Sequence, residues 1–297
     1  MLQPMEAEIA ELWIYPLKSA GGIGLDHAQL SHKGFIWDRQ WMLINEDNRF
    51  VSQRQLSEMA RIKTKLKNDV LKLSFPDCPS LSVPLQRAER ASSPIPATMH
   101  RRDETILVED EGTAAADWLS EKLTSSKSKL RLVRIARDFR RPIPDEGMGD
   151  ILSESVDLAD GYPFLVVGTA SLDLLNDHLW ESSAIKAPLG MERFRPNIIL
   201  KTKTAWSEMK TGTMLVSEDH SIRFKLAKPC QRCGIPQVNQ STGARDVGAG
   251  LHQSLKQLSR EETPSNDFGQ NAILETGEGK SLTVGQTLRL LTPDDES

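Results

Sequence analysis

The chain has 297 residues, a length that allows one large domain or two of ordinary size. Its 37 Lys and Arg residues against 41 Asp and Glu residues give a formal net charge of −4, which argues against a nucleic-acid partner. With 26% charged and 38% hydrophobic residues the composition is that of a globular protein, and apolar runs such as residues 164–167 are far too short to span a bilayer.

The beginning of the chain and its cysteines bear on the compartment. No basic segment followed by an apolar stretch opens the sequence, so we predict no secretory signal and no transmembrane segment. The three cysteines, Cys78, Cys230 and Cys233, are too few for a disulfide framework, and their odd number suits a reducing compartment. We therefore expect a cytoplasmic or mitochondrial protein.

Hydrophobic residues alternate with polar ones in many short segments separated by turn residues, which predicts mostly strands. A hairpin turn is expected at residues 45–48, and another turn at residues 76–79. In chain order the predicted strands are residues 7–15, 40–44, a stretch from 50, 70–75, 81–85, 130–135, 197–200, 222–226 and 287–291.

Helical spacing occurs in three places: residues 114–123, a segment from Thr169 to Leu179, and residues 251–258. In the second, Thr169 is the expected N-cap and Asp173 is expected in the first turn. Residues 161–164 and 268–271 are expected to form turns. Many short strands with few helices predict an α+β fold, mainly β, of β-barrel type rather than a sheet of βαβ units.

A domain boundary is expected within residues 137–154, a charged stretch with two prolines, two glycines and no periodicity. This predicts two lobes, an N-terminal domain of residues 1–136 and a C-terminal domain of residues 137–297, each of ordinary domain size. The alternative is a long active-site loop within one domain.

The segment Lys228–Gly234, with Cys230 and Cys233, carries the most chemical information. A structural zinc site needs a second pair of ligands, which the sequence does not offer. A thioredoxin-like redox pair needs a helix that begins at the first cysteine, whereas Pro236 and the turn-forming residues after it favour a strand and a hairpin. Two interpretations of the cysteine pair remain open: one thiolate is a ligand of a softer metal, or both thiols are structural. Arg232 would lower a thiolate pKa, and in a strand it shares a face with Cys230 and not with Cys233.

Two cationic segments have the composition of anion sites. Lys18 and Ser19 follow the first strand and precede glycines, so freed N–H groups beside an ammonium form a reasonable phosphate cradle, although an ordinary exposed turn explains them too. Arg195, held by the following proline, has the fork geometry for a phosphate or a polar ring; the alternative is a surface pair with Arg193.

Asp38 and Arg39 lie between two tryptophans, where a local salt bridge is an equally good explanation. Phosphate-loop, dinucleotide, zinc-protease and serine-hydrolase motifs are all missing from the sequence. The residues alone therefore predict a two-lobed, β-rich protein with an anion-binding cleft and a candidate reactive cysteine.

Several segments together resemble the MOSC proteins, in particular the mitochondrial amidoxime-reducing component and its plant and fungal relatives. The N-terminal half resembles the MOSC N-terminal β-barrel domain, and the C-terminal half resembles the MOSC domain. The segments extend in order from residue 13 to residue 274: YPLKS, GFIWDRQWML, VSQRQ, DGYPFLVVGTASLDLLN, RFRPNIIL, CQRCGIPQVNQSTG and FGQNAIL.

The resemblance implies a molybdenum cofactor, a pterin dithiolene with a phosphate, bound between the lobes, with Cys233 as the metal ligand and catalytic residue. Animal relatives have serine where this chain has Tyr162 and tyrosine where it has Asn271, so contacts at those positions differ. The implied cofactor-binding residues are Lys18, Ser19 and Arg39 from the N-terminal side, and Asp160, Gly161, Tyr162, Arg195, Asn197, Gln231, Arg232, Cys233 and Asn271 from the other.

The implied activity is a two-electron removal of oxygen from small N-hydroxylated, amidoxime-type compounds at molybdenum. Because the sequence has no iron–sulfur motif, the electrons are expected from another protein, and the resemblance suggests cytochrome b5 with NADH–cytochrome b5 reductase. The alternative is a cofactor carrier or a sulfur-transfer module, as in the C-terminal part of molybdenum cofactor sulfurases; only six residues precede the first predicted strand, which favours the reductase. A third hypothesis is that the protein binds the cofactor or a ligand but catalyses no reaction.

Overall fold

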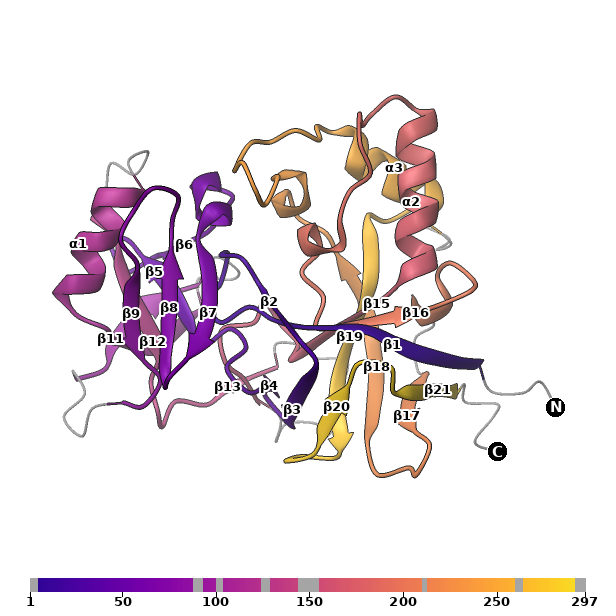
Figure 1. Ribbon diagram of the computed structural model, residues 1–297, viewed down its shortest axis with the longest axis horizontal. Coiled ribbons are helices and arrows are strands. Elements are labelled where there is room, and N and C mark those ends of the chain that lie inside the picture. Colours follow the sequence, from indigo (N-terminus) through magenta and orange to yellow (C-terminus); the bar gives the residue numbers. More distant parts are fainter. Residues whose placement is uncertain are drawn as a thin grey trace.

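The computed structural model describes residues 5–87, 93–99, 104–123, 129–143, 155–209, 213–259 and 264–291. Figure 1 shows two lobes side by side, one formed by the violet and magenta part of the chain and one mostly by the orange and yellow part. Much of the stretch expected to join them, residues 144–154, lies outside the described residues. The exact boundary at residues 136 and 137 stays a prediction.

A closed barrel of seven strands forms the core of the second lobe, as the mainly-β expectation required. Strand β2 (Ile23–Leu25) extends the sheet from β1, and the antiparallel pairing of β1 with β16 closes the barrel. Around the barrel the order is β16 (Ile198–Lys201), β15 (Phe164–Gly168), β19 (Asp267–Thr276), β18 (Arg223–Gln231), β17 (Met214–Ser217), β21 (Thr287–Leu291) and β1 (Met5–Ile14).

Strand β1 comes from the N-terminal end of the chain but belongs to this barrel. It pairs with β16 on one side and with β21 on the other, and Figure 1 shows it crossing from the N-terminal lobe into the barrel. Its alternating burial places Ile9, Leu12 and Ile14 in the barrel core with Phe164, Phe224 and other apolar residues. The first strand therefore physically joins the two lobes.

One βαβ unit interrupts the antiparallel pattern, within a fold that is otherwise the mainly-β barrel predicted in place of a sheet of βαβ units. Strands β15 and β16 are parallel and are connected through helix α2 (Thr169–Glu181). All five residues of β15 are buried, because α2 packs on the side that faces away from the barrel interior, with Leu175 and Leu179 beside Leu165 and Val167. Strands of parallel pairs are commonly buried on both faces in this way.

The N-terminal lobe contains a five-stranded and a three-stranded sheet, with helix α1 (Thr113–Lys122) packed against them. Leu43, Leu71, Leu119 and Leu132 belong to the core that joins these elements. In order, the strands are β10 (Ile95–Thr98), β11 (Thr105–Asp110), β12 (Arg131–Ile135), β5 (Trp41–Ile44) and β6 (Phe50–Val51), and then β7 (Lys63–Lys67), β8 (Val70–Ser74) and β9 (Leu81–Pro84).

The remaining elements are short. Strands β20 (Ser281–Thr283), β3 (His27–Ser31) and β4 (Gly34–Phe35) form one small sheet, and β13 (Arg141–Pro142) pairs with β14 (Ser155–Val156). Helix α3 (Gly250–Leu258) packs against α2. The 3-10 turns are Ser57–Arg61, Met191–Arg193, Ser207–Met209 and Ile235–Gln237. Among the helices of the described residues the longest has 13 residues, and none has the length and apolar character that crossing a membrane requires.

Most predicted elements are confirmed, but the start of the second helix is not. Gly168, and not Thr169, is the N-cap of α2, and Asp173 lies beyond the first turn. The Oγ1 atom of Thr202 accepts a hydrogen bond from Ala170 N at 3.2 Å. The carboxyl group of Glu208, which is fully buried, lies so close that a Cβ on residue 168 would be 2.8 Å from its Oε2 atom. The side chain of Thr202, distant in sequence, therefore caps the start of this helix.

The turn expected at residues 268–271 is instead part of β19. Gly269 has a φ of +77°, and a Cβ there would approach Val167 Cγ2 to 2.6 Å and Val166 O to 2.9 Å, so this glycine permits close contact with β15. After Cys233 the chain forms the 3-10 turn Ile235–Gln237 rather than a strand, and the expected hairpin is reduced to one bridge between Val238 and Arg245.

Candidate functional site

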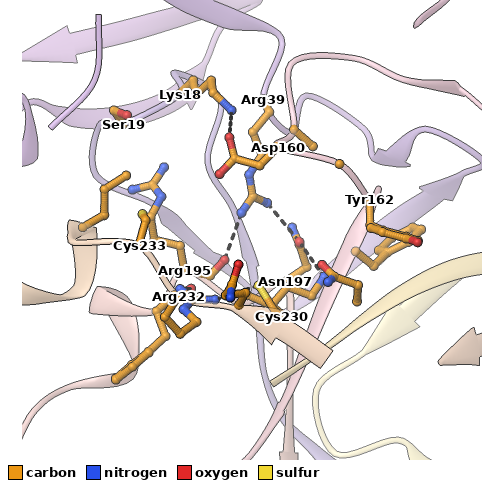
Figure 2. Close-up of a pocket in the computed structure, with 18 of the residues that line it drawn as sticks. Lys18, Ser19, Arg39, Asp160, Tyr162, Arg195, Asn197, Cys230, Arg232 and Cys233 are labelled. Atoms are coloured by element: carbon orange, nitrogen blue, oxygen red, sulfur yellow. Dashed lines mark hydrogen bonds and ion pairs between the residues drawn. The ribbon is translucent and has the colours of Figure 1, made fainter. Parts of the chain in front are cut away.

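A pocket lies where the two lobes meet, and every residue predicted for the cofactor site lines it (Figure 2). The structure thus brings together residues more than 250 positions apart in sequence, although their roles as ligands stay predictions. The predicted residues in the lining are Lys18, Ser19, Arg39, Asp160, Gly161, Tyr162, Arg195, Asn197, Gln231, Arg232, Cys233 and Asn271, and the further lining residues include Phe50, Arg54, Phe194, Cys230 and Ile235.

Lys18 follows β1 and is 7% exposed. Its backbone N–H donates to Trp41 O at 2.7 Å, while its ammonium donates to Leu158 O at 2.7 Å and to the carboxylate of Asp160, two interactions that join the lobes. Burial lowers the pKa of Lys18 to about 8, and the ion pair with Asp160 only partly opposes this effect. An ammonium so poorly hydrated gains much from an anion placed beside it.

Arg39 spans the pocket between the lobes. Its Nη1 atom donates to Asp38 and, at 2.9 Å, to Asn197 Oδ1, and its Nη2 atom donates to Arg195 O at 2.9 Å. The two contacts to Asn197 and Arg195 appear as dashed lines in Figure 2. The salt bridge with Asp38, considered from sequence as an alternative to a site role, is therefore present and holds a guanidinium that lines the pocket.

Arg195 is 9% exposed, and its Nη1 atom donates to Ala20 O. Burial and the nearby charge of Arg39 lower the pKa of Arg195 to about 10. Arg193 is also buried but points elsewhere, forming two bonds of 2.8 and 2.9 Å with Asp246. The alternative of a surface arginine pair is therefore wrong.

Three of the lining residues have a left-handed backbone that is costly for residues with a Cβ. Ser19, Arg39 and Arg195 have φ values of 66°, 45° and 58°. Ser19 is 3% exposed, and its carbonyl accepts a hydrogen bond from Gln53 Nε2 at 2.9 Å, so the exposed-turn interpretation of Lys18 and Ser19 is wrong as well. Strained backbone at several residues of one pocket is typical of a functional site.

The two thiols of the motif line the same pocket but have different surroundings. Arg232 Nη1 donates to Cys230 Sγ at 3.1 Å, but β18 ends at Gln231, so the strand geometry from which a shared face was predicted does not reach Arg232. The backbone around Cys233 is fixed by a contact of 3.1 Å from its carbonyl to His252 Nε2 and by the bond of the same length from Arg232 N to Asn266 O. Both cysteines are half-buried and unbridged.

The donor groups suit a metal-bearing anion better than a metal ion held by protein alone. No cluster of three or more His, Cys, Asp or Glu side chains able to hold a metal occurs among the described residues, which leaves the zinc interpretation without support. A metal at a cysteine here would take its other ligands from a cofactor, and a soft thiolate suits such a metal. The cations Lys18 and Arg195, both buried, and the partly buried Arg39 suit a phosphate, so the residues fit a molybdopterin.

The pocket continues outward past Asp160, Tyr162 and Asn271 to a second hollow lined also by Met99, Glu104, Arg141, Lys228 and Pro229. Tyr162 packs its ring in a small apolar cluster with Ala227 and Ile273, and Figure 2 shows that ring directed away from Cys233. Its side chain therefore forms a wall of the pocket, and its hydroxyl is not directed toward the thiols.

Three functional candidates escaped the sequence analysis. Asp38 fixes Arg39 by accepting a hydrogen bond from its guanidinium. Arg141 donates to the carbonyls of Asp157 and Ala159, and it binds Glu104 through two bonds of 2.8 and 2.9 Å. Arg141 therefore shapes the turn that carries Asp160. Tyr15 lies under two arginines. Arg141 and Tyr15 act through contacts with segments distant in sequence, whereas the adjacent pair Asp38–Arg39 was the one signal visible in the sequence.

The chain is similar to insect proteins that are named molybdenum cofactor sulfurase. It is 28% identical over 273 residues to a protein named molybdenum cofactor sulfurase from Drosophila erecta, and 27% identical over 248 residues to the one from Drosophila grimshawi. These matches cover 90% and 82% of this chain but only 32% and 30% of the relatives, so the chain spans about a third of their length.

A solved structure, that of the YUAD protein from Bacillus subtilis, covers 98% of this chain and 99% of its own, at 9% identity and a TM-score of 0.45. Residues 6–126 match the family model of the MOSC N-terminal beta barrel domain, and residues 153–289 match that of the MOSC domain. With both domains present in this order, the chain belongs to the MOSC-domain proteins.

Proposed function

We propose that this protein binds a molybdenum cofactor in the pocket between its lobes and reduces small N-hydroxylated compounds of the amidoxime type. The observation that supports this best is the joint presence, in one pocket, of two buried cations and one partly buried cation from both lobes with a cysteine just beyond the end of β18: Lys18, Arg195, Arg39 and Cys233. Burial lowers the pKa values of Lys18 and Arg195 even with the carboxylates nearby, so a phosphate placed beside these cations would gain from them.

In this proposal Lys18, Arg39 and Arg195 bind the phosphate of the cofactor, and Cys233 supplies the thiolate ligand of the metal. When bound, the cofactor supplies two-electron redox chemistry. Asn197 orients Arg39 through the 2.9 Å bond to Oδ1, and it is itself fixed by its bond to Trp13 O at 3.1 Å. The protein thus presents a preformed cradle, which reduces the loss of conformational freedom on binding.

The source of electrons is part of the proposal. The sequence carries no iron–sulfur, flavin or haem motif, so we expect a separate donor, and cytochrome b5 with its NADH-dependent reductase is the pair that the amidoxime-reducing relatives suggest. A cytoplasmic or mitochondrial location is consistent with such a donor.

A second candidate function is that of a cofactor carrier or sulfur-transfer module. The relatives named molybdenum cofactor sulfurase favour it, since their matches cover most of this chain, and so does the presence of two thiols in one pocket. A sulfur-transfer module would carry a persulfide on one of these cysteines and would not reduce amidoximes. Mass spectrometry of the protein after incubation with a sulfur donor separates the two functions.

The primary test uses protein produced in a host that makes the cofactor. We expect about one molybdenum and one pterin per chain, and reduction of benzamidoxime with dithionite-reduced viologen but not with NADH alone. Zinc in place of molybdenum, with no pterin fluorescence after oxidation, would contradict cofactor binding. Full cofactor loading with no reduction, together with a persulfide, would favour the second candidate.

A further inference from the structure

We propose that Tyr15 is a positioning residue whose aromatic ring holds the guanidinium groups of Arg39 and Arg195 in place for the anionic group of the ligand. The inference rests on the proposed function, because it takes these two arginines as anion-binding residues. Tyr15 is the last residue before the turn that carries Lys18, and it does not itself line the pocket.

The geometry around the ring supports this role. The Cζ atom of Arg195 is 4.2 Å from the centroid of the Tyr15 ring, and the Cζ atom of Arg39 is 4.6 Å from it. Tyr15 is 1% exposed, so both contacts are largely shielded from water, which strengthens a cation–π interaction. One ring thus attracts two cations that repel each other, and it opposes their separation when no anion is bound.

The hydroxyl group is not what makes this residue suitable. Tyr15 OH is buried and has no hydrogen-bond partner among the described residues, and burial strongly raises its pKa, so it stays neutral. The backbone, by contrast, is fully used: Tyr15 N donates to Asp38 Oδ1 at 2.7 Å, and Tyr15 O accepts from Arg39 N at 3.1 Å. A substitution keeps those backbone bonds available and changes only the ring.

The experiment compares three variants: Tyr15→Phe, Tyr15→Leu and the control Phe35→Leu. Phe35 is also an aromatic residue of the barrel core, 3% exposed, and its described ring contact is with Phe164 rather than with a guanidinium. Binding of inorganic phosphate to cofactor-free protein is measured by calorimetry, molybdenum per chain after expression is measured in parallel, and unfolding curves report stability.

We expect Tyr15→Phe to bind phosphate as the unchanged protein does, and Tyr15→Leu to bind it about tenfold more weakly or worse. Phe35→Leu should lower stability to a comparable extent but leave phosphate affinity within about twofold. Equal losses of affinity in Tyr15→Leu and Phe35→Leu, or a loss in Tyr15→Phe as large as in Tyr15→Leu, would overturn the role of the ring.

Failure of the proposed function is recognised separately, because the unchanged protein would then bind neither phosphate nor molybdenum. If Tyr15→Leu is too unstable to purify, replacement of Tyr15 by 3,4,5-trifluorophenylalanine keeps a ring of similar size while weakening its negative face. Affinity equal to that of Tyr15→Phe would then contradict the proposal, and weaker binding would support it.

Discussion

Replacing Arg195 with methionine separates the role of this residue in binding from its role in stability. The side chain is 9% exposed, and its pKa is lowered to about 10 by burial and by Arg39, so its charge is unfavourable in the folded, ligand-free protein. A lowering of this size corresponds to about 3 kcal/mol at neutral pH. The lost bond to Ala20 O, about 1.5–3 kcal/mol, and the lost contact with the Tyr15 ring, about 1–2 kcal/mol, act in the opposite direction.

These contributions largely offset one another, so the free energy of unfolding of the cofactor-free variant should change by about 2 kcal/mol or less. The affinity of the variant for phosphate should fall, because removing one partner of a buried charge pair typically costs about 2–5 kcal/mol. This corresponds to an increase of about 30-fold to a few thousandfold in the dissociation constant. The measurements are urea unfolding of cofactor-free protein followed by circular dichroism, molybdenum per chain, and calorimetry with inorganic phosphate.

Arg193→Met is the matched control, since Arg193 lies only two residues away and is 6% exposed. It binds Asp246 through two bonds and does not line the pocket. Because the Asp246 side chain is 41% exposed, its loss of a partner should lower stability by only about 1–2 kcal/mol while phosphate affinity stays unchanged. Unchanged affinity in Arg195→Met, or equal effects of both variants on binding, would refute the reasoning.

Three further predictions concern other groups. Because the pKa of Lys18 is lowered to about 8, its positive charge is lost as the pH rises through that value, so the affinity for inorganic phosphate should fall by at least about tenfold between pH 8 and 10, and this fall should be absent in Lys18→Arg. Cys233→Ser should abolish amidoxime reduction and alter the molybdenum spectrum, whereas Cys230→Ser should keep measurable turnover; the reverse result would contradict the ligand assignment. Burial raises the pKa of Glu208, so the stability gained from its protonated form is present at acid pH and is lost as the pH rises through the raised pKa. Glu208→Gln should remove this pH dependence and should be more stable than the unchanged protein at pH 8. Thermal unfolding measured across this pH range tests the prediction.

Local sequence signals predicted individual elements well and their long-range pairing poorly. The hairpin around residues 45–48 and the helix near residues 114–123 depend on turn chemistry and periodicity, both visible in a short window. Two other features cannot be predicted from a short window, because they depend on how closely distant backbones approach each other. These features are the parallel pairing of β15 with β16 and the strand that passes through Gly269. From the sequence alone Gly269 indicates a turn, and only its close contact with Val167 in the structure explains why a glycine is needed in this strand.

The site divides in the same way. Lys18, Arg39, Arg195 and Cys233 were found because charged or reactive residues beside glycine, proline or aromatic residues are unusual within scaffolding, and the family resemblance joined them. Tyr15 was invisible because a buried tyrosine in a strand is ordinary. Its relation to Arg39 and Arg195 exists only when a segment from each lobe meets at the ring.

The closure of the barrel by β1 orders events during synthesis. The first strand emerges from the ribosome early, but its barrel neighbours, β16 at residues 198–201 and β21 at residues 287–291, are made much later. Until then β1 has only β2 as a partner, along Leu12–Ile14, and the rest of its edges are unpaired; contacts this distant in sequence form slowly. The pocket needs residues as late in the chain as Cys233 and Asn271, which lies on β19, so a ligand can be enclosed only after nearly the whole described chain has left the ribosome. Under the proposed function the cofactor would therefore bind after this part of the chain is made, and the nascent chain depends meanwhile on protection of that early edge.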